Sequence, residues 1–270
     1  MESISIKNLT FSRSKLVSSE LPKSSRKLAK FAQSISLPKS SKIQDDKILD
    51  KVNLSLEKGD VLCISGESGK GKSSLLRVIA GLEKAQSGEI SLFGEPIKQG
   101  DWNALSMAQK GMGFVLQNDA LLSDLTVEDN IALPLRYHNM GTEEEIKQKV
   151  DRALMMMLAS GFAKFYPSSL SLGMRKRVAI ARSWVLDAKI LLLDEPTAGL
   201  DKTSRNNLLS LMDNLRELHK TTIIMVINDL QIARDLNGKM SFLMDKKLTY
   251  PMYYNEIKES DDPRIRAMIH

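Results

Sequence analysis

The chain has 270 residues, 42% of them hydrophobic and 27% charged, and a formal net charge of +6. This composition is typical of a soluble globular protein, and we interpret the chain as one domain with an inserted subdomain. No apolar run approaches the roughly 18 residues that a membrane-spanning helix needs, so we expect no such helix. The single cysteine, Cys63, excludes an internal disulfide, and the first residues lack the pattern of a secretory signal. Both features favour the reducing cytoplasm.

Two segments near the N-terminus alternate between apolar and polar residues, as half-buried strands do. Residues 3–9 have the pattern of an edge strand, and residues 48–56 have the same pattern and end at a turn over residues 58–60. The intervening residues 14–46 are rich in serine and lysine and predict a basic insertion. A solvated loop fits that composition, and so does a surface insertion with one short basic amphipathic helix.

The next segment carries the most specific motif of the chain. Residues 66–73 spell G-x-x-x-x-G-K-S between an apolar strand, residues 61–65, and a helix, residues 74–80. Glycines in such a loop allow backbone N–H groups to surround phosphate oxygens at the start of the helix. We expect Lys72 to reach the β- and γ-phosphates and the hydroxyl of Ser73 to bind Mg²⁺. The expected phosphate-binding residues are Gly66, Glu67, Ser68, Gly69, Lys70, Gly71, Lys72, Ser73 and Ser74.

A long polar and helical region follows over residues 101–187. A strand over residues 112–116 precedes Gln117, whose side-chain amide we expect to join the metal shell. The clearest helix begins at Thr142, where Glu145 completes a capping box, and stops at Gly161. Its expected apolar stripe consists of Ile146, Val150, Leu154, Met157 and Leu158. The methionines at residues 155–157 fit packing within the core and also fit an adaptable contact with a partner.

Residues 188–270 form the remainder of the predicted core. Residues 189–193 and 222–227 read as buried strands, and a helix lies between them. Its apolar positions are Leu208, Leu211, Met212, Leu215 and Leu218. Strands that alternate with helices predict an α/β fold with a mostly parallel sheet, which binds ligands where its strands end. Gly66, Asp194 and Asn228 fall at such ends.

Two adjacent carboxylates end the strand over residues 189–193. We expect Asp194 to hold Mg²⁺ through water and Glu195 to polarise the water that attacks the γ-phosphate. A second anion site is predicted at residues 170–174, where Ser171 and backbone N–H groups precede a helix over residues 175–185. Because two such sites do not easily grip one phosphate within one subunit, the pattern favours a head-to-tail pair of chains with ATP between them.

The order of these motifs resembles that of an ABC transporter ATPase. The motifs are the phosphate loop, Gln117, Leu-Ser-Leu-Gly-Met at 170–174, Asp-Glu-Pro-Thr at 194–197 and Ala-Gly-Leu-Asp at 198–201. The resemblance spans nearly the whole chain apart from residues 14–46. It implies a P-loop NTPase core of the RecA type with an antiparallel β edge, and an inserted helical subdomain that docks a membrane permease. It also implies that Ser171 and Gly173 bind ATP, and that Asp201 lies in a D-loop across the dimer interface.

Three short stretches are similar to the ATPases of MCE-associated phospholipid transporters, the Mla type. The first is Met174, which stands in place of the glutamine in the family's usual signature, Leu-Ser-Gly-Gly-Gln. The second is residues 118–136, which follow Gln117 of the Q-loop, and the third is Asp-Pro-Arg-Ile-Arg at 262–266. This similarity implies movement of phospholipid between bacterial inner and outer membranes. The implied partners are a permease of the Mla E type, an MCE-domain protein, a STAS-domain subunit and a second copy of the chain. The implied location is the cytoplasmic face of the inner membrane, as a peripheral protein.

Four positions depart from the family pattern. Asn228 stands where family members carry a histidine that contacts the γ-phosphate, and its amide donates a hydrogen bond but cannot become cationic. We therefore expect ATP turnover to be lowered, by up to about a hundredfold. Leu172 replaces a glycine of the signature and is expected to crowd the closed dimer interface, and Ser169 replaces a glutamate. The usual adenine-stacking aromatic is absent, and the guanidinium of Arg13 is expected to stack instead.

Three other functions compete with that of a phospholipid motor. The first is a slow, ATP-gated regulatory subunit, which Asn228 and Leu172 favour and Glu195 opposes. The second is the ATPase of an FtsE-like, lipoprotein-release or macrolide-export system. The third is a soluble protein that acts on nucleic acid or ribosomes. Such proteins usually carry two cassettes or a long coiled coil, and this sequence has neither, so we expect no nucleic-acid partner.

Overall fold

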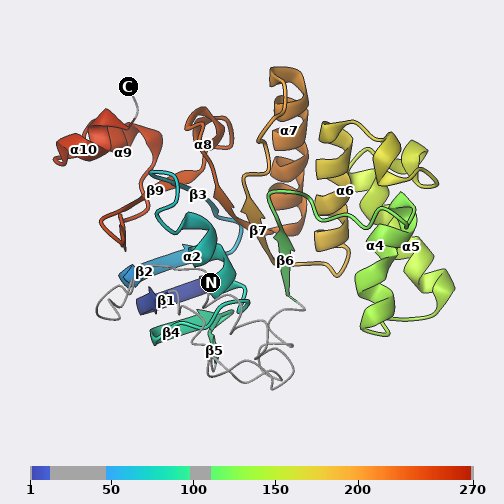
Figure 1. Ribbon diagram of the computed structural model, residues 1–270, viewed down its shortest axis with the longest axis horizontal. Coiled ribbons are helices and arrows are strands. Elements are labelled where there is room, and N and C mark those ends of the chain that lie inside the picture. The colour runs from blue at the N-terminus through green and yellow to red at the C-terminus, as the bar shows by residue number, and fades with distance from the viewer. Residues whose placement is uncertain (1, 13–46, 98–110, 269–270) are drawn as a thin grey trace, which may run out of the picture.

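The computed structural model describes residues 2–12, 47–97 and 111–268 (Figure 1). The expected insertion at residues 14–46 and the expected adenine contact Arg13 lie outside these residues, and so do residues 101–110 of the expected subdomain region. Within the described ranges, no helix is both long and apolar enough to cross a membrane.

A six-stranded, mostly parallel sheet forms the centre of the fold, in the order β10, β9, β3, β8, β7, β6. Its strands are β3 (Val61–Ser65), β6 (Met112–Val115), β7 (Ile190–Asp194), β8 (Thr222–Val226), β9 (Lys239–Met244) and β10 (Lys247–Leu248). Every residue of β3, β7 and β8 is buried, as expected for parallel strands that are covered on both faces. The predicted α/β fold is therefore confirmed.

Alternate residues of these strands face two hydrophobic cores. Cys63 and Leu191 belong to the core that contains helices α6 and α7, whereas Leu62 and Leu192 belong to the core that contains helix α2 and the antiparallel sheet. The helices around the sheet are α2 (Lys72–Ile79), α6 (Leu172–Trp184), α7 (Lys202–His219), α8 (Gln231–Asp235), α9 (Tyr254–Lys258) and α10 (Pro263–Ala267). This alternation allows helices to pack on one face of the sheet, and a helix together with a second sheet on the other.

The expected antiparallel edge is a separate four-stranded sheet. Its strands are β1 (Glu2–Ser12), β2 (Lys47–Glu57), β4 (Ser87–Leu92) and β5 (Glu95–Ile97), in the order β2, β1, β4, β5. The prediction of an edge strand at residues 3–9 is wrong, because β1 pairs with β2 on one side and with β4 on the other. Residues 3–6 are also all buried, which breaks the simple alternation of an edge strand.

A helical subdomain lies to one side of the core (Figure 1). It contains α4 (Val127–Tyr137), α5 (Glu143–Met156), the short 3-10 helices η2 (Ser160–Phe162) and η3 (Pro167–Ser169), and α6. The predicted capping box is present, since Thr142 accepts from the backbone N–H of Glu145 and the Glu145 carboxylate accepts from that of Thr142. The helix ends at Met156 rather than Gly161, and Leu158 is 67% exposed with a φ of 50°. Leu158 therefore does not belong to the predicted apolar stripe.

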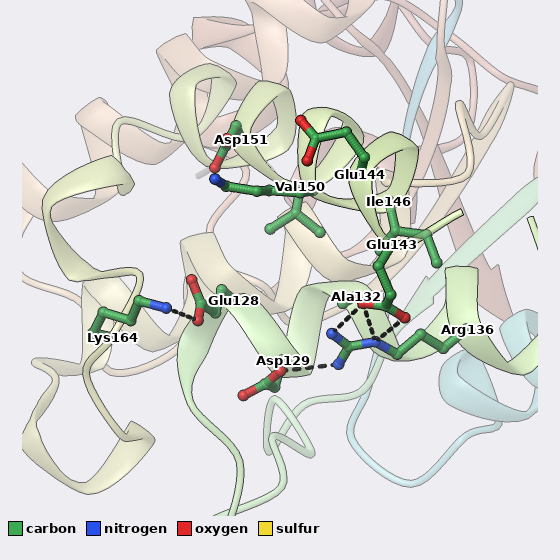
Figure 2. A pocket seen from close by; sticks show the side chains of 11 residues that line it. Glu128, Asp129, Ala132, Arg136, Glu143, Glu144, Ile146, Val150, Asp151 and Lys164 are labelled. Atoms are coloured by element: carbon green, nitrogen blue, oxygen red, sulfur yellow. Dashed lines mark hydrogen bonds and ion pairs between the residues drawn. The ribbon is translucent and has the colours of Figure 1, made fainter. Parts of the chain in front are cut away.

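Charged residues connect α4 and α5 around a cavity of about 290 Å³ (Figure 2). The guanidinium of Arg136 lies 2.9 Å from Asp129 Oδ1 in its own helix and 2.9 Å from Glu143 Oε2 at the start of α5. Lys164 forms an ion pair with Glu128 of α4, away from the contact between Arg136 and Glu143 (Figure 2). These pairs are partly exposed, so each contributes little stability. Among the three, the pair between Arg136 and Glu143 is the one that joins α4 to α5.

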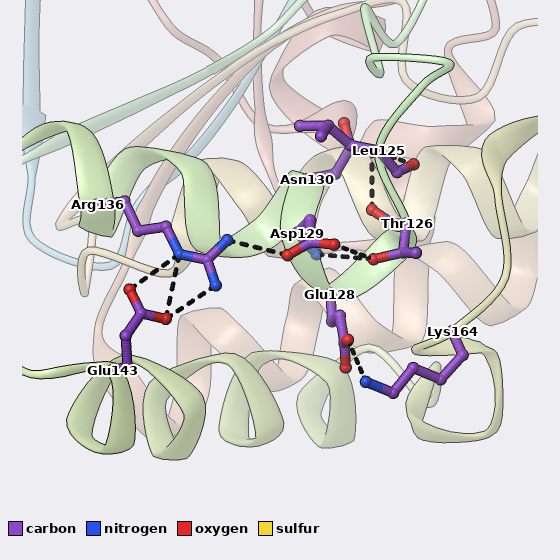
Figure 3. Close-up of polar contacts among 8 residues, drawn as sticks. All are labelled: Leu125, Thr126, Glu128, Asp129, Asn130, Arg136, Glu143 and Lys164. Carbon is purple, nitrogen blue, oxygen red and sulfur yellow. Dashed lines mark hydrogen bonds and ion pairs between the residues drawn. The ribbon is translucent and has the colours of Figure 1, made fainter.

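Asn130 holds the loop before α4 against the helix (Figure 3). This side chain is fully buried, and its amide oxygen accepts from the backbone N–H of Leu122 at 2.9 Å. Its amide nitrogen lies 3.0 to 3.1 Å from the carbonyl oxygens of Leu122, Leu125 and Thr126.

Asn130→Ala leaves these buried groups without their partner, and we expect it to lower the free energy of unfolding by about 2–4 kcal/mol. Denaturant titration of the purified chain measures this loss.

Asn214→Ala provides the matched control for that measurement. Asn214 is exposed on α7, so the same truncation is expected to change the free energy of unfolding by less than about 0.5 kcal/mol. A loss for Asn130→Ala no larger than that of the control would contradict the structural role of Asn130.

Candidate phosphate and metal site

The phosphate loop occupies the turn between β3 and α2. Gly66 and Gly71 have φ values of 139° and 105°, a backbone region that residues with side chains rarely adopt. A Cβ at Gly66 would lie 2.6 Å from the backbone oxygen of Leu243, and one at Gly71 would lie 2.2 Å from Ile48 Cγ2. Glycine is therefore required at both positions. Gly71 also stands at the N-cap of α2 without a side-chain cap, which leaves the first N–H groups of the helix available to an anion.

Lys72 spans the phosphate loop from the first turn of α2. Its ammonium group donates to the backbone oxygens of Gly66 at 2.6 Å and Glu67 at 3.0 Å. The side chain is only 7% exposed, and this burial lowers the pKa of Lys72, an effect that the nearby carboxylates of Glu195 and Asp194 oppose. A buried cation that is directed along the loop is suited to phosphate oxygens.

Ser73 and Asp194 meet where α2 begins and β7 ends. The Ser73 hydroxyl donates to Asp194 Oδ1 at 2.9 Å. Asp194 is 4% exposed, and burial raises its pKa, while the hydrogen bond from Ser73 and the charge of Arg77 act in the opposite direction. A cation next to this carboxylate would offset the cost of its burial.

Gln117 and Glu195 also come together, although 78 residues separate them in the sequence. Gln117 lies two residues after the end of β6. Its amide nitrogen donates to Glu195 Oε2 at 3.1 Å. Glu195 has a φ of 49°, a left-handed conformation that is uncommon for glutamate and typical of functional sites. Its backbone N–H donates to the oxygen of Val226 at 3.1 Å, which fixes the turn after β7.

One cavity of about 330 Å³ brings together Gly71, Lys72, Ser73, Gln117 and Glu195, whereas Gly66 and Asp194 are not part of its lining. Its lining consists of Ile48, Ser68, Gly69, Gly71, Lys72, Ser73, Ser74, Arg77, Gln117 and Glu195. Ile48 and Arg77 are absent from the sequence-based prediction. Arg77 could have been found from helical spacing, because it lies four residues after Ser73 on the same face of α2. Ile48 gave no signal, since only the folded chain brings β2 next to Gly71.

The oxygen atoms of this site fit Mg²⁺. Ser73, Gln117 and Asp194 offer a hydroxyl, an amide and a carboxylate oxygen, and Mg²⁺ in nucleotide sites uses one or two carboxylates together with phosphate oxygens. Within the described ranges, no group of three or more His, Cys, Asp or Glu residues is placed to hold a metal ion. The ligands are therefore those of a cation that is shared with phosphate, rather than of a closed protein cage.

Asn228 follows β8 at the same edge of the sheet but is not part of the cavity lining. Its side chain is exposed. The next residue, Asp229, forms an ion pair with Arg205 on α7 and accepts from the backbone N–H of Gln231 at 2.9 Å. The loop that carries Asn228 is thus tied to α7, while the Asn228 side chain points into accessible space.

The predicted second anion site lies outside the cavity. Ser171 caps α6 by accepting from the N–H of Met174 at 3.3 Å, so the helix begins at Leu172, three residues earlier than predicted. Asp201 caps α7 through the N–H of Ser204 at 2.9 Å. The two helix starts are neighbours, because a Cβ on Gly173 would lie 3.4 Å from Ser204 Cβ. Within one chain, Ser171, Gly173 and Asp201 are therefore brought together with each other but not with Lys72.

Leu172 lies against Gly199, in the segment before α7. A Cβ placed on Gly199 would lie 3.0 Å from Leu172 Cδ2, and Gly199 has a φ of 76°. Leu172 is half-buried, so at least part of this side chain packs within its own subunit. Crowding of a dimer interface by Leu172 stays a prediction.

The fold and the site together define an α/β phosphate-loop nucleotide hydrolase, and comparisons with known proteins identify its family. A sequence model described as ABC transporter matches residues 49–198. The chain is 33% identical over 222 residues to the methionine import ATP-binding protein MetN of Legionella pneumophila, a match that covers 82% of this chain and 65% of that protein. It is 38% identical over 218 residues to the aliphatic sulfonates import ATP-binding protein SsuB of Bacillus cereus, a match that covers 77% of this chain and 82% of that protein.

A solved structure agrees with this result. The dimeric ATP-binding cassette MJ0796, bound to ADP and Pi in a post-hydrolysis state, superposes with a TM-score of 0.74 at 27% identity, over 93% of this chain and 98% of that one. The chain therefore belongs to the ABC transporter family. The expected P-loop fold, the ATPase activity and the cofactors ATP and Mg²⁺ are confirmed.

Proposed function

We propose that the chain is the ATP-hydrolysing motor of a membrane transporter and works as a pair of copies beneath a permease. The observation that carries this proposal is the meeting of Gln117 and Glu195, at 3.1 Å, in the cavity that Lys72 and Ser73 line. A phosphate cradle without a positioned carboxylate would only bind nucleotide. A carboxylate next to the cradle supplies a base for hydrolysis.

Each residue has a separate role in this proposal. Lys72 and the backbone N–H groups of the loop would bind phosphate oxygens. Ser73, Asp194 and Gln117 would hold Mg²⁺, which would supply positive charge next to the phosphates. Glu195 orients the attacking water and accepts its proton. Gln117, which contacts Glu195, reports the state of the site to the helical subdomain that follows it in sequence.

The second half of the site comes from a second copy of the chain. Ser171, Gly173 and Asp201 gather at two neighbouring helix starts away from the cavity, as a surface that contacts the nucleotide of a partner would. The dimeric state of the MJ0796 cassette supports this arrangement.

The transported molecule has two candidates. Phospholipid is favoured by the Mla-type features of the sequence, namely Met174, residues 118–136 and residues 262–266. Import of a small polar solute is favoured by the relatives, which are named for methionine and for aliphatic sulfonates. We propose phospholipid, because the three features occur together at separate positions. An FtsE-like, lipoprotein-release or macrolide-export system stays the alternative among transporters.

The proposed partners follow from the phospholipid assignment. They are a permease of the Mla E type, an MCE-domain protein and a STAS-domain subunit, with the chain attached to the cytoplasmic face of the bacterial inner membrane. The proposed binding site of the STAS-domain subunit is the charged cavity between α4 and α5 in the helical subdomain (Figure 2). Five acidic and three basic residues line this cavity, and the acidic excess would favour a basic partner surface there.

Purification of the chain from its native membrane with its partners tests this assignment. We expect an MCE-domain protein to co-purify and the complex to move a fluorescent phospholipid between vesicles when ATP is supplied. Co-purification with a periplasmic solute-binding protein, together with ATP-dependent uptake of methionine or a sulfonate, would contradict phospholipid transport and support import. The matched control is the same complex with Glu195→Gln, in which neither transport should occur.

A further inference from the structure

The segment that carries Gln117 leaves β6 through an unusual turn. Asp119 and Ala120 have φ values of 62° and 47°, which place two consecutive residues with side chains in the left-handed region. Local hydrogen bonds, such as that from the N–H of Asp119 to the oxygen of Leu116 at 3.0 Å, only partly define this turn. Since left-handed backbone is unfavourable for such residues, contacts from elsewhere must hold it.

Two cations of helix α6 supply those contacts. Lys176 donates to Asp119 Oδ1 at 3.1 Å and lies 3.3 Å from the backbone oxygen of Gln117. Arg182 donates to the backbone oxygens of Asp119 at 2.9 Å and Ala120 at 2.8 Å. The backbone oxygens of Gln117, Asp119 and Ala120 thus each accept from a cation of α6.

The ion pair between Lys176 and Asp119 is nearly inaccessible to water. The side chains are 3% and 6% exposed. Burial removes the favourable hydration of both charges, and their mutual attraction roughly offsets that loss of free energy. Overall stability is therefore a weak reason for the presence of this pair. The pair does, however, constrain the turn, because Lys176 contacts Asp119 Oδ1 and the backbone oxygen of Gln117 at the same time.

We propose that Lys176 is a positioning residue for ATP hydrolysis, which acts by holding the backbone of Gln117 so that its amide meets Glu195. The inference rests on the proposed function, since it assigns Gln117 a role in turnover. It also links the two halves of the site, because Lys176 lies on the helix that Ser171 caps and contacts the segment that lines the cavity. Arg182 supports the same turn from the next part of α6.

A double-mutant cycle on the full chain in its transporter complex tests this role. Lys176→Met is expected to lower kcat about tenfold with less than a twofold change in KM for ATP, because nucleotide contacts stay intact while Gln117 is misplaced. In a Gln117→Ala background, Lys176→Met should lower kcat by less than about twofold further. Asp119→Asn is the second variant, and it should reproduce the effect of Lys176→Met in both backgrounds.

Lys239→Met is the matched control. Lys239 Nζ lies 2.9 Å from Asp60 Oδ2, and this ion pair is not part of the cavity lining. The control variant should leave kcat unchanged. Hydrogen exchange without nucleotide is the second readout, and the amides of residues 117–120 should exchange faster in Lys176→Met than in the native chain or in Lys239→Met.

Each outcome bears on a different claim. Equal losses of kcat in the native and Gln117→Ala backgrounds, or unchanged exchange at residues 117–120, would overturn the positioning role and leave the proposed function intact. Absence of ATP turnover in the native complex would overturn the proposed function and the positioning role with it.

Discussion

Replacement of Glu195 by glutamine is expected to lower the steady-state rate of ATP hydrolysis by about 10²- to 10⁴-fold. The amide keeps the shape of the side chain and its place beside Gln117, but it does not accept a proton from the attacking water. Lys72 and the glycines of the loop are untouched, so Mg-ATP should bind with nearly native affinity. Phosphate release by the complex and equilibrium binding of a fluorescent ATP analogue measure the two effects separately.

Glu89→Gln is the control for this experiment, because Glu89 is exposed on β4 and lies outside the cavity lining. Its rate should equal that of the native complex. If Glu195→Gln kept more than a tenth of native turnover, Glu195 would not be the base, and the 3.1 Å contact with Gln117 would need another explanation.

The second large effect is a gain of activity. Asn228→His is expected to raise ATP turnover by up to about a hundredfold. An imidazole becomes cationic and then donates a charged hydrogen bond to the γ-phosphate, whereas an amide donates only a neutral one. The exposed side chain of Asn228 leaves room for the larger ring. The ion pair of Asp229 with Arg205 should hold the loop in place in both forms.

The control here is Asn214→His, on the exposed face of α7, which should not change turnover. Turnover by Asn228→His that equals or falls below the native rate would show that the chain uses asparagine as effectively as histidine. The chain would then be a full-speed motor rather than a slowed one.

Local signals were sufficient for the parts of the fold that depend on neighbouring residues. The apolar runs of β3, β7 and β8, the glycines of the phosphate loop and the capping box at Thr142 all follow from short-range rules. Errors arose where long-range pairing decides. Strand β1 looks like an edge because its pairing with β4, far along the chain, is invisible in its own pattern. Helix α4 was missed, and it contains Pro134, a residue that normally argues against a helix.

The site shows the same division. The sequence predicts Gln117 in the metal shell and Glu195 next to the attacking water, and the structure joins the two side chains by a hydrogen bond. Packing of α6 against the turn after β6 could not be foreseen, because nothing in the spacing of Lys176 and Asp119 predicts a buried ion pair. Leu158 was placed on the apolar stripe of α5 by periodicity, but the helix ends before reaching it.

The central claim is that one copy of the chain completes the nucleotide site of another. Two variants of different mass, Lys72→Ala in the phosphate loop and Ser171→Arg at the start of α6, test it by native mass spectrometry with Mg-ATP. Each variant alone should stay monomeric, whereas their mixture should form a mixed dimer, because only that pairing unites an intact Lys72 with an intact Ser171. A mixture that forms no more dimer than either variant alone would contradict a site shared between two chains.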